Sequence, residues 1–182
     1  GPGDTVAIVG AGPVGMATLL TARFYSPARI IMVDADPARL ALARTFGATD
    51  TIDVTRENAV ERLLALTDGV GVDVAIEAVG IPATFDVCQQ AIAPGGRIAN
   101  VGVHGKSVEL HLEQLWIRNI TLTTGLVSTS STPLLLQTVQ AGSVDPGALV
   151  THRFALDDIL TAYDVFANAA REKAMKVLLS AP

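Results

Sequence analysis

The stretch TVAIVGAGPVG, residues 5–15, decides the fold of this chain. Its first five residues are mostly apolar and predict a strand, and an apolar helical pattern follows the glycines. Gly10 allows a tight turn, Gly12 lets the backbone approach a pyrophosphate, and Gly15 lets the helix pack closely on the sheet. Pro13 suits the first helical turn, where its missing N–H costs nothing. This pattern is typical of a turn that binds dinucleotide phosphates, and the candidate residues are Gly10, Gly12, Pro13, Val14 and Gly15.

A second strand that ends in an acid strengthens this interpretation, because a glycine triplet alone is weak evidence. Residues 29–33 predict that strand, and Asp34 follows it, 19 positions after Gly15. At this spacing an acid binds the ribose hydroxyls of a dinucleotide. The strand, helix, second strand and acid therefore all indicate the same kind of site.

Asp34 also favours NAD over NADP, because NADP places a phosphate where NAD has a hydroxyl. Two unit charges 4 Å apart interact by about 4 kcal/mol at an effective dielectric constant of 20. About a third of that energy is still a tenfold difference in affinity. Arg39 follows on the next predicted helix, where it either offsets the charge of Asp34, lies on the adenine face or is simply solvated. Asp36 adds a further negative charge, and NAD stays the predicted cofactor.

Strands and helices alternate along the rest of the chain. Further strands are predicted at residues 51–54, 72–77, 97–101 and 121–124, and helices at residues 37–46, 57–66 and 82–92. This alternation predicts an α/β fold with a doubly wound, mostly parallel six-stranded sheet. Ligands of such sheets bind beyond the carboxyl ends of the strands. Two glycine loops follow predicted strands there, at residues 78–80 and 102–105, and they either approach a ligand or simply end the strands.

Composition excludes several other classes of protein. The chain has 182 residues, is 49% hydrophobic and carries a net charge of −5 without a Lys/Arg cluster, so nucleic acid is not an expected partner. No apolar run is long enough for a membrane span and no signal-peptide pattern occurs, so we expect a cytoplasmic protein. Cys88 is the only cysteine and cannot form an internal disulfide. The three histidines lack the patterns of a zinc site, and no metal ligand is predicted.

The glycine turn, Asp34, the EAVG turn at residues 77–80 and the PGGR turn at residues 94–97 occur in a characteristic order and spacing. Together they resemble the coenzyme-binding Rossmann domain of zinc-type medium-chain alcohol and polyol dehydrogenases. The resemblance covers nearly the whole chain, including a predicted helix at residues 157–169 and strand at residues 175–179. It implies that Asp34 binds the adenosine ribose and that Lys176 reaches the pyrophosphate. The other residues that it assigns to the cofactor are Val79, Val101, Val103, Leu126 and Ser128.

The resemblance also implies what the chain lacks. In that family the zinc ligands lie in an N-terminal domain that is absent here, and this chain begins without an initiator methionine. We therefore expect a cofactor domain at residues 1–147 and a segment returning to the catalytic domain at residues 148–182. The parent would be an NAD-dependent, zinc-requiring alcohol or polyol dehydrogenase, and the fragment would bind NAD(H) without turnover. Residues 121–126 would pair two copies in a homodimer.

Two other classes also need a nucleotide site. A stand-alone NAD-sensing or regulatory module requires no catalytic residues, although the returning tail argues against it. A methyltransferase that binds S-adenosylmethionine also uses a glycine turn and an acid after its second strand. Gly15 and Lys176 disfavour that interpretation.

Overall fold

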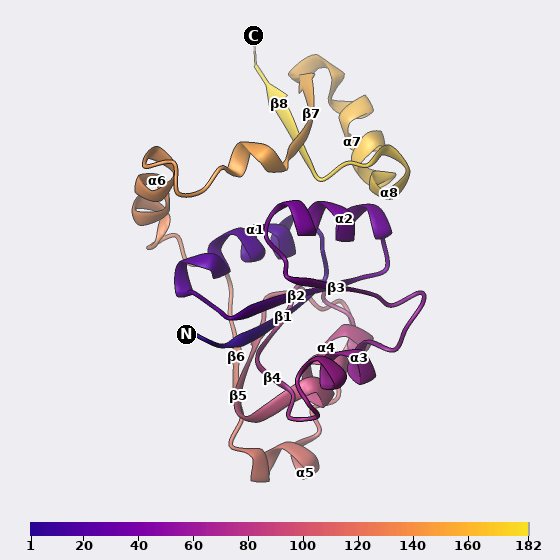
Figure 1. Cartoon of the computed structure of the whole chain (residues 1–182). Helices are drawn as coiled ribbons and strands as arrows, with labels where there is room; N and C mark the ends of the chain where they lie inside the picture. The colour runs from indigo at the N-terminus through magenta and orange to yellow at the C-terminus, as the bar shows by residue number, and fades with distance from the viewer. Residues whose placement is uncertain (182) are drawn as a thin grey trace. The chain divides into compact units, whose positions relative to one another are not determined.

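The computed structural model describes residues 1–181, which form two compact units (Figure 1). The first unit comprises Gly1–Val127 and the second begins at Ser128. The sequence predicts a different division, between a cofactor domain that ends at residue 147 and a segment that returns to a catalytic domain. That division stays a prediction.

The first unit is built on one six-stranded parallel sheet, which confirms the predicted α/β architecture. Its strands run in the order β3-β2-β1-β4-β5-β6, so the order reverses between β1 and β4. All five neighbouring pairs are parallel. The strands are β1 (Thr5–Val9), β2 (Arg29–Asp34), β3 (Asp50–Asp53), β4 (Val72–Glu77), β5 (Ile92–Asn100) and β6 (Thr121–Thr124).

Helices cover both faces of this sheet, with α1 and α2 on one side and α3 and α4 on the other (Figure 1). Proline stands in the first turn of α1, α2 and α4, where its fixed φ suits a helix start. The side chains of Asp36 and Asn58 cap α2 and α3. The helices are α1 (Pro13–Ala22), α2 (Pro37–Thr45), α3 (Ala59–Leu66), α4 (Pro82–Ala91) and α5 (Leu112–Leu115), with short 3₁₀ turns at Arg23–Tyr25 and Trp116–Arg118.

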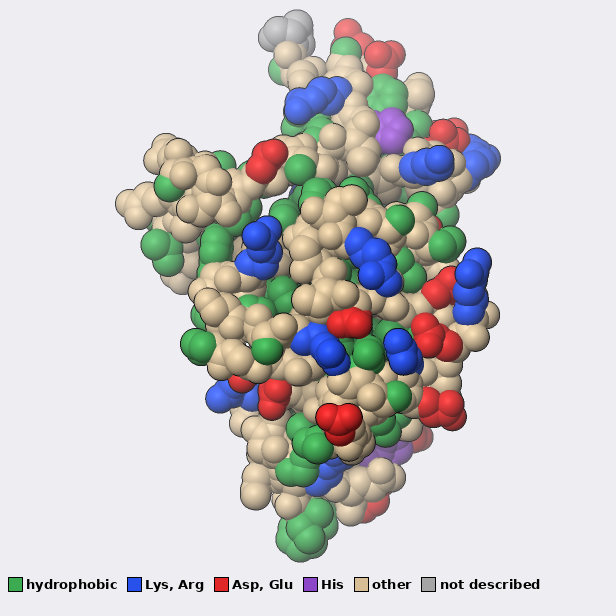
Figure 2. Space-filling view, in the orientation of Figure 1, with side chains coloured by type: hydrophobic (Ala, Val, Ile, Leu, Met, Phe, Trp, Pro, Cys, Tyr) green, Lys and Arg blue, Asp and Glu red, His purple; other side chains and the backbone are tan. Residues whose placement is uncertain are grey.

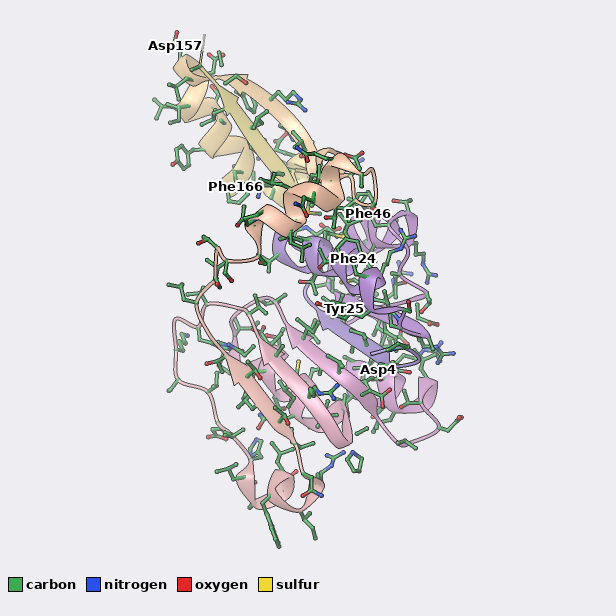
Figure 3. All side chains as sticks on the ribbon, turned by 90° about the vertical axis from the view of Figure 1, so that its left-hand side faces the viewer. Asp4, Phe24, Tyr25, Phe46, Asp157 and Phe166 are labelled. Carbon is green, nitrogen blue, oxygen red and sulfur yellow. The ribbon has the colours of Figure 1, made fainter. Side chains whose placement is uncertain are left out.

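The core lies on both faces of the central strands. Ile8, Ile31 and Ile98 are almost completely buried, and burial of successive residues explains why β1 and β2 appear as apolar runs in the sequence. Asp4 lies just before β1, at the end of the sheet where the strands begin (Figure 3). Its Oδ2 is 4.0 Å from Arg97 Nη1. Strand β6 is exposed at all four residues and forms an edge of the sheet.

One predicted boundary in this unit is wrong. The PGGR turn at residues 94–97 belongs to β5, which begins at Ile92 and not at the predicted residue 97. Its register against β4 shifts between Val72 and Val74, and Gly95 has a φ of +77°. A glycine in that conformation lets the strand bulge and continue, so the residues that indicate a turn do not end it here.

The second unit contains a two-stranded parallel pair, β7 (Val150–Ala155) and β8 (Lys176–Ser180). The predicted tail helix is interrupted, because its first residues form a 3₁₀ turn and a second short helix begins after Asn168. The helices are α6 (Thr132–Gln140), α7 (Ile159–Ala167) and α8 (Ala169–Glu172), with 3₁₀ turns at Pro146–Leu149 and Leu156–Asp158. The sequence pattern had not predicted α6 or β7.

Candidate functional site

The turn after β1 is tight enough to require two of its glycines. Gly10 has a φ of +109° and donates from its N–H to the Val33 carbonyl at 2.8 Å. A Cβ at Gly10 would lie 2.5 Å from Val79 Cγ2, and a Cβ at Gly15 would lie 1.8 Å from the Gly10 carbonyl oxygen. Helix α1 therefore begins directly against the turn, and the protein's own packing excludes side chains at both positions.

Gly12 differs from its neighbours, because a Cβ there would meet nothing within 4 Å. Its φ of −73° and ψ of −175° are open to any residue, and no side chain caps α1 at this residue. The first N–H groups of a helix have no partner within the helix and carry a partial positive charge. The turn thus leaves open space at a helix N-terminus, which fits an anionic group such as a pyrophosphate.

Asp34 links the end of β2 to this turn. Its Oδ2 accepts a hydrogen bond from Ala11 N at 2.6 Å, and its Oδ1 accepts one from Asp36 N at 2.8 Å. Each carboxylate oxygen has a second lone pair that these bonds do not use, so the acid can still accept ribose hydroxyls. Asp34 is half-buried and held in place by backbone groups before any ligand arrives.

Arg39 faces Asp36, with its Nε 3.6 Å from Asp36 Oδ2. Among residues 1–181, no ion pair to Asp34 lies within 4.0 Å. Arg39 therefore makes no direct contact that would offset the charge of Asp34, which was one of its three interpretations. Without such a contact, an Asp34 carboxylate would repel a phosphate at the ribose.

A groove of about 810 Å³ opens at this edge of the sheet, within the range for small-molecule sites. Gly10, Gly12, Asp34, Arg39 and Val79 line it, and the structure thus brings these predicted residues together. The groove also includes residues that follow β3 and β4 and that the sequence pattern did not single out, among them Val54, Asn58, Ile81 and Thr84. Their position directly after β3 and β4 could have predicted their place in the groove, because the carboxyl ends of parallel strands all lie on one side of the sheet.

The two glycine loops expose aliphatic side chains. Val79, Val101 and Val103 are 45%, 48% and 87% exposed, respectively. Only Val79 of these three lines the groove. Apolar side chains left in solvent at the ligand edge of a sheet offer a surface for an aromatic ring.

Three further predicted cofactor residues are described within their own units. Leu126 follows β6 and is 94% exposed. Ser128 and Lys176 belong to the second unit, where the Lys176 carbonyl accepts from Thr151 Oγ1 at 3.3 Å. The assignment of all three to a cofactor stays a prediction.

The structure offers no built metal centre in the part of the chain that it describes. No group of three His, Cys, Asp or Glu side chains in residues 1–181 is placed to hold a metal ion. Likewise, none of the described helices has the length and apolar character needed to cross a membrane.

A parallel six-stranded sheet with a glycine turn where the strand order reverses and an acid after β2 defines the dinucleotide-binding class of doubly wound folds. The model of the family described as zinc-binding dehydrogenase matches residues 13–141, more than half of the chain. The chain belongs to this family.

Solved and curated relatives agree with this assignment. A zinc dependent alcohol dehydrogenase 2 from Streptococcus pneumonia, in its apo form, is 56% identical with a TM-score of 0.93, covering 97% of this chain and 52% of that one. An alcohol dehydrogenase from Cupriavidus necator is 35% identical over 97% of this chain and 49% of its own length. An L-idonate 5-dehydrogenase from Vitis vinifera is 31% identical over 99% of this chain and 50% of its own length. The chain thus spans about half the length of the curated relatives it matches.

Proposed function

We propose that this chain is the NAD(H)-binding half of a zinc-requiring alcohol or polyol dehydrogenase. The observation that carries the proposal is the open space at Gly12, where α1 begins without a side-chain cap and next to the pre-positioned Asp34. A pyrophosphate fits the first feature and a ribose fits the second. The relatives named as alcohol and L-idonate dehydrogenases support the reaction class.

In this proposal each part of the site binds one part of the cofactor. The turn at residues 10–15 binds the pyrophosphate, with Lys176 as a second contact, and Asp34 binds the adenosine ribose. The nicotinamide ring supplies the chemistry when bound, because it accepts or donates a hydride. The residues that orient and shield that ring are Val79, Val101 and Val103, with the backbone of Leu126 and Ser128 at its carboxamide.

The zinc of the whole enzyme belongs, in this proposal, to residues outside this chain. There it would lower the pKa of the bound alcohol. The chain alone binds cofactor but does not turn over substrate. Titration calorimetry of the chain with NADH, repeated with NADPH at the same salt concentration, tests the central claim. We expect NADH to bind at least about tenfold more tightly, and a failure of both to bind would contradict the proposal.

We further propose that β6 pairs with β6 of a second copy to form a homodimer. An exposed edge strand presents unpaired backbone groups, and apolar residues follow it at Leu126 and Val127, which are 94% and 83% exposed. Analytical ultracentrifugation should detect the dimer in the micromolar range. A monomer throughout that range would contradict it.

A further inference from the structure

A buried carboxylate lies beneath the two glycine loops, of which the first, at residues 78–80, lines the groove with Ala78 and Val79. Glu77 ends β4 and is completely buried. Its Oε1 accepts hydrogen bonds from Val79 N at 2.9 Å, Gly80 N at 2.9 Å and Thr84 Oγ1 at 2.6 Å. One oxygen atom thus fixes the loop at residues 78–80 and the first turn of α4.

The other oxygen of Glu77 faces the loop after β5. Oε2 lies 3.5 Å from His104 Nε2 and has no hydrogen-bond partner among the described residues. His104 Nε2 is 2.8 Å from Asn100 Oδ1, and because that oxygen only accepts, Nε2 carries the proton. A Cβ at Gly102 would lie 2.2 Å from Oε2, so only glycine allows this approach.

The two loops also touch each other through their backbones. The Glu77 carbonyl accepts from Val101 N at 2.9 Å and from Gly102 N at 3.0 Å. Gly80 has a φ of +90°, and a Cβ there would lie 2.3 Å from the Val103 carbonyl oxygen. No side chain separates the loops, and a shift of one therefore moves the other.

The charge of Glu77 needs this set of partners. An isolated buried carboxylate is costly unless hydrogen bonds and an opposite charge compensate it. Among the described residues, His104 Nε2 is the only basic nitrogen within 4.0 Å of a Glu77 carboxylate oxygen. Helix α4 offers the Thr84 hydroxyl and the buried Cys88 thiol, whose pKa is raised by burial and also by the Glu77 charge.

We propose that Glu77 and His104 are a positioning pair for the cofactor. They hold residues 78–80 and residues 101–105 at the separation that the nicotinamide half of NAD(H) requires. The pair acts through Val79 and Val103, which the loops carry at the exposed edge. This inference rests on the proposed function, because that function places these loops at the nicotinamide ring.

The pair should therefore affect the two halves of the cofactor differently. ADP-ribose has the adenosine, pyrophosphate and second ribose of NADH but lacks nicotinamide. The test measures the dissociation constants of NADH and ADP-ribose for the 182-residue chain and for Glu77→Gln. Glutamine keeps an oxygen for Val79 N and Gly80 N and removes the charge that faces His104. The matched control, Glu113→Gln, makes the same change at an exposed acid outside the groove.

We expect Glu77→Gln to weaken NADH binding about tenfold, within the range for a charge-assisted contact, and ADP-ribose binding less than about twofold. The fluorescence of bound NADH should also shift toward that of free NADH. Glu113→Gln should change neither ligand. His104→Phe serves as a second variant if Glu77→Gln does not fold, and it should give the same split between the ligands.

Three outcomes would overturn the inference. Equal losses for both ligands would assign Glu77 to fold stability alone. No loss for either ligand would show that the loops keep their positions without the pair. Failure of the unmodified chain to bind NADH would overturn the proposed function itself. This outcome differs from the other two because it is measured without any substitution.

Discussion

The two units of this molecule both contain parallel strands, but they bury them very differently. In β1 and β2, four residues of each strand are buried, whereas β7 and β8 contain no buried residue. On α7, Leu160 and Tyr163 are 81% and 66% exposed. The first unit therefore has a core built on its strands, whereas the buried side chains of the second unit, such as Leu149, Ala162 and Met175, lie outside its two strands. The strongest constraints on sequence therefore lie in the first unit, around the turn after β1.

The largest expected effect comes from Gly15, where the sheet and α1 meet most closely. Gly15→Ala places a Cβ 1.8 Å from the Gly10 carbonyl oxygen, so the turn or the helix must move. We expect the free energy of unfolding to fall by about 3 kcal/mol, measured by urea denaturation. The matched control is Gly12→Ala, whose Cβ meets nothing within 4 Å, and it should cost less than about 0.5 kcal/mol.

The second largest effect is expected from a substitution of Gly12, which should weaken NADH binding without lowering stability. Gly12→Val fills the open space at the start of α1 with a branched side chain. We expect NADH affinity to fall more than about a hundredfold, close to 2.7 kcal/mol, by titration calorimetry. The melting temperature should stay within a few degrees of the unmodified chain. An unchanged affinity would place the pyrophosphate elsewhere.

The third effect concerns Asp34 and the choice of cofactor. Replacing Asp34 with Ser and Ala35 with Arg removes a negative charge near the ribose and adds a positive one. We expect the ratio of NADH to NADPH affinity to fall at least about tenfold. The single variant Ala35→Arg keeps the acid and should shift the ratio less. If the double variant leaves the ratio unchanged, Asp34 does not contact the ribose.

The first unit was predictable from sequence largely because β1 and β2 are buried on both faces and turn residues separate the other strands. The strands at residues 72–77 and 121–124 lie where the apolar and turn residues predicted them. In the second unit, β7 contains Thr151, His152 and Arg153 and alternates between half-buried and exposed positions. That pattern lacks the apolar run of a buried strand, and the pairing of β7 with β8 joins segments about 25 residues apart.

The candidate site divides in a similar way. The glycine turn and Asp34 were predictable, because backbone conformation and a strand-end acid are local features of the sequence. Glu77 is also an acid that ends a strand, yet it is completely buried and directed at two loops, while Asp34 lines the groove. Only the three-dimensional arrangement of the loops after β4 and β5 shows that Glu77 lies beneath the loops while Asp34 lines the groove.

The smallest expected effect tests α7 in the second unit, which exposes Leu160 and Tyr163. Figure 2 shows that hydrophobic side chains reach the surface among charged and polar ones. Leu160→Ala removes a side chain that is 81% exposed, so little buried area is lost. We expect the free energy of unfolding to change by less than about 0.5 kcal/mol, measured by urea denaturation. The matched control is Leu63→Ala on α3, where the leucine is completely buried and the same change should cost about 2–5 kcal/mol.

A large loss of unfolding free energy in Leu160→Ala would contradict the difference in burial between the two units. It would mean that α7 is covered in solution, and concentration-dependent unfolding would then identify the cover as a second copy of the chain. A small cost, independent of protein concentration, would leave α7 uncovered in this chain. The apolar face of α7 would then be free to pack against the catalytic half that the proposed function requires, because an exposed apolar face is a typical surface for association.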